Sequence, residues 1–241
     1  MIHSIAANRR PTHRLGKGLD RTAPPVPGPW RMAMLLSAAA VSAGPFSPLS
    51  AQGLFGPGKF KIEATDDRFS TSATTMVIGR NNRLTKKSPA GGIYINGQGL
   101  YLNPVAVKSR DGNLVQIGFL VENQTDIDTN YGSPNSLGAL RKVSFLVNGT
   151  KLIATPVTAA DQRFSNAIAY NTITNSASSA LSERGMIFLK TQDMAALANA
   201  ATVAVQIEGT SQTWTVEAKD ISKPFLANVR AFYATQVASG G

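Results

Sequence analysis

Apolar and polar residues alternate in short runs along most of the chain from residue 60 onward. The alternation is clearest in segments 203–208 and 213–217 near the C-terminus. A period of two places successive side chains on opposite faces of a β-strand, so both segments are predicted strands. Gly209-Thr210 between them predicts a tight loop, because a glycine there can adopt positive φ. That loop sets Val205 opposite Trp214.

Asn148-Gly149 is the strongest short hairpin signal in the chain, since both residues tolerate positive φ. It lies between the apolar-rich segments Lys142–Val147 and Thr150–Ala154. A two-residue loop at this position sets Phe145 opposite Leu152, with both side chains on one face.

Other runs rich in β-branched and aromatic residues predict further strands at 60–64, 74–78, 93–95, 100–102, 105–108, 114–123, 167–174 and 185–189. Two polar stretches, Gln124–Leu137 and Asn175–Glu183, are expected to be loops because they lack apolar periodicity.

Helices are expected on both sides of the C-terminal hairpin. Thr191 can cap a short helix over 193–199, and Ser222 can cap a final helix, since hydroxyl side chains accept hydrogen bonds from early helical N–H groups. In the final helix, spacings of four, four and three residues define one apolar stripe. Its members are Ile221, Phe225, Val229 and Phe232.

These elements together predict a mainly β fold. About ten short antiparallel strands favour a two-sheet sandwich, with one short helix and a C-terminal helix packed on it. A β-barrel is the alternative architecture. Residues 60–237 are expected to form this single β-rich domain.

The N-terminal part has a different pattern. Residues 32–51 follow Arg31 with a short apolar core and small residues, which predicts a secretory signal peptide cut after Ala51. Its core is too short for a comfortable membrane span, which needs about 20 residues. Residues 1–31 are expected to be a disordered basic extension, or the product of a start codon assigned too far upstream. Residues 52–59 read as a Gly/Pro linker.

Removing that segment changes the charge and chemistry of the chain. The 241 residues carry a net charge of +10, but residues 52–241 hold 18 of the 24 Lys and Arg and 13 of the 14 Asp and Glu, or +5. Both His precede residue 52, and there is no Cys. This remainder cannot build a Ser-His-Asp triad, a Cys nucleophile or a Cys/His zinc site. A charge of +5 favours anionic surfaces but gives no strong nucleic-acid signal.

One loop carries oxygen ligands at every second position. Asp126, Asp128 and Asn130 have the spacing that a flexible calcium loop uses. These residues resemble the start of an EF-hand loop, but Tyr131 stands where the family has Gly and Leu137 where it has Glu. The two predictions are therefore a calcium site of another kind, or a solvated turn capped by Asp.

A second candidate site is basic. Arg80, Arg83, Lys86 and Lys87 lie close together in the sequence and could contact phosphate-rich lipid headgroups or glycans. The alternative is an ordinary solvated loop.

A short similarity links two distant segments. Asp66–Ser70 and Asp161–Ser165 both read D-x-R-F-S, which reflects either chance or a duplication. The expected structural role is an Asp–Arg ion pair, with Phe69 and Phe164 entering the core.

No catalytic residue is predicted. Asp66 with Asp67, or Glu122 with Asp126, could serve as acid and base for glycoside cleavage only if a cleft brought them together. We therefore expect an exported, non-enzymatic binding or accessory protein of the bacterial cell envelope, periplasmic or secreted. It would act through a sheet edge or loop surface, on an envelope protein or an anionic surface. The alternatives are a carboxylate-based hydrolase and a calcium-dependent carbohydrate-binding module.

Overall fold

The structure, a computed structural model, describes residues 58–66, 74–94 and 97–237. All of these belong to a unit that spans residues 41–241. The predicted extension 1–31 and signal peptide 32–51 lie outside the described residues, as do all but the last two residues of the linker.

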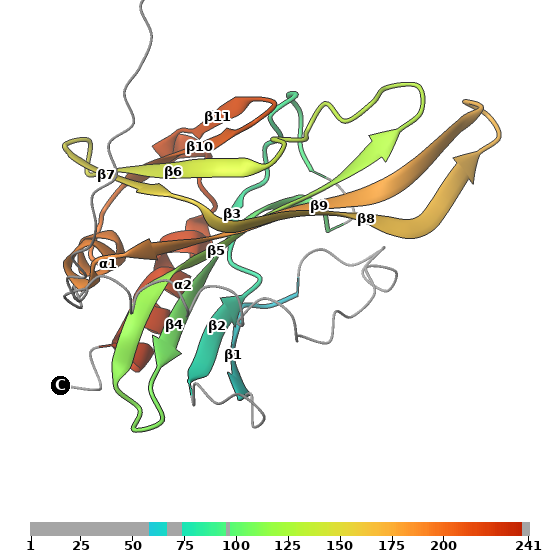
Figure 1. Cartoon of the computed structure of the whole chain (residues 1–241). Coiled ribbons are helices and arrows are strands. Elements are labelled where there is room, and N and C mark those ends of the chain that lie inside the picture. The colour runs from blue at the N-terminus through green and yellow to red at the C-terminus, as the bar shows by residue number, and fades with distance from the viewer. Residues whose placement is uncertain (1–57, 67–73, 95–96, 238–241) are drawn as a thin grey trace, which may run out of the picture. The chain divides into compact units, whose positions relative to one another are not determined.

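The larger of two antiparallel sheets has seven strands in the order β1-β2-β4-β5-β9-β8, with β3 added to β4 (Figure 1). Its strands are β1 (Lys61–Asp66), β2 (Thr75–Arg80), β3 (Arg83–Thr85), β4 (Gly99–Lys108), β5 (Leu114–Asp128), β8 (Thr158–Asn171) and β9 (Ser176–Leu189).

The smaller sheet has four strands in the order β11-β10-β6-β7. They are β6 (Leu140–Val147), β7 (Lys151–Pro156), β10 (Val203–Gly209) and β11 (Thr213–Val216). Two helices, α1 (Thr191–Ala198) and α2 (Lys223–Gln236), and a 3-10 turn, η2 (Ala218–Asp220), complete the described elements.

The core lies between the two sheets. Phe119 on β5 and Phe145 on β6 are both buried, and their ring centroids are 5.7 Å apart. Ile187 of β9 and Val205 of β10 belong to the same apolar cluster. The two-sheet sandwich is therefore confirmed. Both sheets end in open edge strands, so the closed alternative is not formed by the described residues.

The final helix packs as the apolar stripe predicts from Phe225 onward, whereas Ile221 lies before the helix and is partly buried against the main core. Phe225 and Val229 join the main core, while Phe232 contacts a small cluster with Val77 and Ala106 of the large sheet. Ser222 occupies the N-cap position, but its hydroxyl donates to the Arg83 carbonyl oxygen at 2.5 Å and makes no capping bond. The helix start is thus tied to β3.

The predicted cap of the first helix is wrong by one residue, because Lys190 holds the N-cap position of α1 and Thr191 is already helical.

The predicted register of the C-terminal hairpin is wrong. Trp214 lies opposite Ile207 rather than Val205. The loop is longer than two residues because it is bonded to another segment: the Ser211 N–H donates to the Leu137 carbonyl at 3.0 Å. A Cβ on Gly209 would lie 1.9 Å from that same carbonyl oxygen, so only glycine permits this approach.

The β6–β7 register also differs from the prediction, and by one residue. Phe145 pairs with Ile153, which turns Leu152 outward to 67% exposure. Asn148 has φ of 51°, and its side-chain oxygen accepts hydrogen bonds from the N–H groups of residues 201 and 202. The turn therefore includes Thr150, and a one-residue slip moves every side chain to the other face.

The loop predicted at Asn175–Glu183 is wrong, because all but its first residue is strand. The loop predicted at Gln124–Leu137 is right from residue 129 onward, and only residues 124–128 belong to a strand. β5 continues to Asp128, and β9 begins at Ser176. Each owes its strand form to pairing on the large sheet, where β9 lies between β5 and β8. Among the described residues, the neighbouring strands predicted at 93–95 and 100–102 do not pair with each other. β4 instead pairs with β3, and Ile95 lies outside the described residues.

Candidate interaction surface

Three strands of the large sheet continue together beyond the sandwich and form a protruding arm (Figure 1). We define the arm as residues 125–128 of β5, 161–171 of β8 and 176–182 of β9. The register across β5 and β9 has no irregularity from Ile117 to Asp128, so the alternation of the core continues into the arm.

The arm is amphipathic. One face carries apolar side chains in cross-strand rows, because directly paired residues share a face. Ile168, Ser179 and Ile127 form one row, and Phe164 pairs with Leu181 in the next. The opposite face carries acids, an arginine and serines, namely Asp126, Asp128, Asp161, Arg163, Ser178 and Ser182.

The apolar face is exposed. We define the arm face as Ile127, Phe164, Ile168 and Tyr170, whose exposed fractions are 36%, 59%, 71% and 61%. This face is continuous with the inner face of the large sheet, where Phe119 and Val121 are buried under the small sheet. Two further apolar residues at the tip, Tyr131 and Ile173, are 73% and 94% exposed.

Hydrogen bonds hold the strands together to the tip of the arm. The Thr129 N–H donates to the Ala177 carbonyl at 2.9 Å, and the Ala177 N–H donates to the Thr129 hydroxyl at 2.9 Å. The Asn130 side-chain amide donates to the Thr174 carbonyl at 3.0 Å. The arm face is therefore presented by a three-stranded sheet rather than by a loop.

A buried carboxylate anchors the base of the arm. Glu183 of β9 is fully buried and accepts five hydrogen bonds. The donors are the Asn123 and Gln162 side-chain amides, the Ser136 hydroxyl, and the backbone N–H groups of Leu137 and Gly138. Such bonds to a charged acceptor are about twice as strong as neutral ones. Glu183 thereby fixes the loop 136–138 against the arm.

Tyr94 extends this network. Its hydroxyl donates to the Asn123 side-chain oxygen at 2.9 Å, and burial raises the pKa of Tyr94 well above its ordinary value. The hydroxyl therefore stays protonated and remains a donor. The ring also meets Trp214 edge-on, with centroids 6.2 Å apart, and so links the network to the small sheet.

A second polar network lies on the other face of the sheet. Register places Arg83, Tyr101, Glu122, Arg184 and Asp161 in one row across five strands. Glu122 is 5% exposed, lies 3.0 Å from the Arg184 Nε and accepts from Asn103 at 2.6 Å. Burial is the main cause that raises the pKa of Tyr101, whose hydroxyl donates to the Gly97 carbonyl at 2.7 Å.

The described carboxylates are not arranged as an acid–base pair for glycoside cleavage. Glu122 and Asp126 share one strand face four residues apart, which separates their backbones by about 13 Å at the usual rise of a strand. Glu122 is also engaged by Arg184 and Asn103. Asp67, the proposed partner of Asp66, lies outside the described residues.

The predicted calcium ligands lie near the tip of the arm. The Asp128 side-chain oxygen accepts from the Asn130 N–H at 2.8 Å, which is the Asp-capped turn of the alternative prediction. Asp126 shares the polar face of β5 with Asp128. Within the described ranges, no three His, Cys, Asp or Glu side chains are grouped to hold a metal ion. Calcium binding stays a prediction.

Three of the four side chains of the predicted basic site contact different partners within the chain. Arg80 pairs with Glu63 at 2.6 Å, and Lys87 pairs with Asp220 at 2.7 Å. Arg83 lies over the Tyr101 ring, 5.8 Å from its centroid. Lys86 is exposed. Binding to an anionic surface also stays a prediction, and three of its four cations already have partners within the chain.

The D-x-R-F-S segment of β8 gives a mixed outcome. Asp161 and Arg163 form the expected ion pair. Phe164, expected in the core, is instead 59% exposed on the arm face. Residues 67–70 of the other copy lie outside the described residues.

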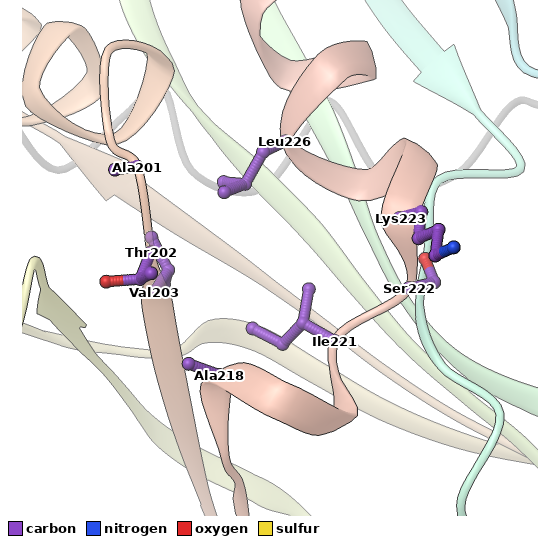
Figure 2. A pocket seen from close by; sticks show the side chains of 8 residues that line it. All are labelled: Ala201, Thr202, Val203, Ala218, Ile221, Ser222, Lys223 and Leu226. Carbon is purple, nitrogen blue, oxygen red and sulfur yellow. The ribbon is translucent and has the colours of Figure 1, made fainter.

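A shallow pocket lies between the starts of β10 and α2, with Ile221 and Leu226 pointing into it (Figure 2). Its volume of about 190 Å³ is below the ~300–1,000 Å³ that is usual for small-molecule sites. The lining residues are Ala201, Thr202, Val203, Ala218, Ile221, Ser222, Lys223 and Leu226. It offers one cation and no acid, so it supplies no acid–base pair.

Fold and surface together define a β-sandwich protein with an amphipathic, three-stranded arm. Comparison with protein-family models, with curated proteins and with solved structures finds no match. Neither helix in the part of the chain that the structure describes has the length and hydropathy of a membrane span.

Sequence reasoning missed the arm because β8 is irregular. Its register against β9 shifts between Thr158 and Asp161, and again between Phe164 and Ile168. Each bulge interrupts the period of two that marks a strand. Within 168–171 the alternation does hold, with Ile168 and Tyr170 on one face, and this signal could have located the arm face.

Proposed function

We propose that this chain is a non-enzymatic binding or accessory protein that acts through the arm face. The observation that supports the proposal is the gathering of four large, exposed apolar side chains on one face of a hydrogen-bonded sheet. Exposed patches of this kind commonly mark interaction sites in soluble proteins. The described carboxylates and the pocket offer no comparable arrangement for catalysis.

We further propose that the protein acts in the bacterial cell envelope after export. Residues 32–51 support this, because their short apolar core and small residues are typical of a signal peptide. The absence of Cys fits a chain that relies on its packed core rather than on disulfides in that compartment. Cell fractionation and the mass of the mature N-terminus test this part, and an intact N-terminus in the cytosol would contradict it.

Affinity capture from envelope extracts tests the arm face. The bait is the full chain, compared with Ile168→Asp on the arm face and with Leu152→Asp as a matched control. Ile168 and Leu152 are 71% and 67% exposed, and they lie on different sheets. The proposal expects a captured protein to be lost with Ile168→Asp and kept with Leu152→Asp. Equal capture by both variants would refute it.

A further inference from the structure

The arm face lacks the second layer that the rest of the sheet possesses. Sheets in a sandwich pack face to face, with the apolar side chains of both inner faces interleaved. The small sheet supplies that layer over Phe119 and Ile187, which are 1% and 0% exposed. Farther along the same strands, Ile127 and Phe164 are exposed. The missing layer is thus an apolar sheet surface.

The edge of β8 is poorly suited to adding a partner strand. Strand addition needs an uninterrupted row of free backbone groups. β8 carries two bulges, and its extended backbone is interrupted at Ala159, which has φ of 52°. Bulges at an edge are a common defence against edge-to-edge pairing. The open face is therefore better suited to a partner than the edge of β8.

Charge favours a second copy of this chain as that partner. The paired positions of the arm face are apolar, hydroxyl or small residues, since Ser179 and Ala177 lie between the large side chains. The acids and the arginine of the arm occupy the opposite face. Two net-positive chains can therefore meet through this face without placing like charges in contact, whereas a highly charged partner would find no complement there.

The area matches a weak, reversible contact. Large aromatic side chains bury roughly 150–250 Å² each, so the four partly exposed side chains of the arm face offer about 400–500 Å² per arm. Two arms would bury about 800–1,000 Å² together, which is below the ~1,200 Å² of stable interfaces and in the range of transient ones.

We infer that two copies of this chain pair through their arm faces, packed face to face about a two-fold axis. This inference rests on the proposed function and names the partner of the same surface. Each arm supplies the layer that the other lacks, so the pair extends the sandwich across two molecules. A two-fold arrangement also makes the contact closed, which prevents growth into fibres.

Sedimentation velocity of the full chain over a range of concentrations tests the inference. We expect a monomer–dimer equilibrium that Ile168→Asp or Tyr170→Asp weakens by roughly tenfold or more, because each places an unpaired charge in an apolar contact. Leu152→Asp should leave the dimer intact. Circular dichroism and the unfolding midpoint check that all three variants fold. A wild-type chain that is monomeric at every concentration would overturn the inference.

Cross-linking provides a second test, because the chain has no Cys. Ile168→Cys with a short thiol-specific cross-linker should give a covalent dimer, and Leu152→Cys should not. Equal yields from the two positions would overturn face-to-face pairing even if a dimer exists.

The two proposals can fail separately. A monomeric chain whose capture of an envelope protein is lost with Ile168→Asp would overturn self-pairing and leave the proposed binding function standing. An arm-dependent dimer that captures nothing else supports self-pairing and removes the case for a separate partner.

Discussion

Two stretches of the same face of the large sheet differ in burial. On β5, Phe119 and Val121 are buried beneath the small sheet, while Ile127, six residues beyond Val121, reaches 36% exposure on the arm face. The strands, the register and the alternation are the same in both stretches. The difference teaches that alternation predicts which side chains share a face, whereas exposure depends on whether another layer extends far enough to cover them.

The largest expected contrast is between two phenylalanines on that face. Phe119→Ala should lower the free energy of unfolding by about 3–5 kcal/mol, because it leaves a cavity against Phe145. Phe164→Ala should change it by no more than about 0.5 kcal/mol in a dilute sample, since the ring is exposed. Urea denaturation measures both. Equal losses would mean that the arm face is already covered in the monomer.

The junction between the two stretches should be almost as sensitive. Glu183→Leu is expected to lower the free energy of unfolding by about 3 kcal/mol, because it leaves the buried N–H groups of Leu137 and Gly138 without an acceptor. Hydrogen exchange should show faster exchange at those two amides. Glu217→Leu, at an exposed position, is the control and should have little effect. A mild loss for Glu183→Leu would show that water can replace the carboxylate.

A smaller effect of opposite sign is expected where the arm begins. Thr125 is 3% exposed, and its buried hydroxyl has no hydrogen-bond partner. Thr125→Val should therefore stabilise the protein by about 1 kcal/mol. Thr129→Val is the matched control and should not stabilise, because the Thr129 hydroxyl accepts from the Ala177 N–H. Thermal unfolding compares them, and destabilisation by Thr125→Val would indicate an ordered water at the site.

The smallest effect is expected at the other edge of the large sheet, which is charged rather than apolar. A hydrogen bond from Lys61, and then one from Arg80, hold the pKa of Glu63 below its ordinary 4.5, against an opposing effect of burial. A pKa lowered by folding adds stability above 4.5, and this is lost as the pH falls through the folded value. Glu63→Gln should therefore cost less than about 1 kcal/mol near neutral pH, since exposed pairs contribute little. Denaturation at several pH values should show that the difference in unfolding free energy between the wild type and Glu63→Gln disappears as the pH falls below 4.5.

Much of the fold could be predicted because it depends on local patterns. The apolar stripe of α2 follows from residue spacing, and the strands of the β4–β5 hairpin follow from runs of β-branched and aromatic residues. The hairpin registers could not be predicted, because distant segments lengthen both turns. Asn148 is engaged by residues 201 and 202, and Ser211 bonds to Leu137.

The candidate surface was harder to predict than the fold. Its strands are rich in Ser, Ala and Asn, a composition that resembles a loop when pairing partners are unknown. β9 is a strand because β5 and β8 flank it, which is a property of the sheet and not of the segment. The sequence does indicate that Asp126 and Asp128 lie on the same face of a strand. It does not reveal that Ile127, between them, lies on the opposite face where no second sheet covers it.

The Glu183 anchor has a consequence for the order in which the chain can fold. Loop 136–138 takes its partners from a residue 45 to 47 positions later, and Gln212 donates to its Ser136 carbonyl from 76 positions later. As the ribosome delivers the chain, this loop can bond only to water until those residues emerge. Closure over such separations is slow, so the segment is a natural target for proteases and chaperones during synthesis. In a chain truncated before residue 183, loop 136–138 would lack its carboxylate acceptor permanently.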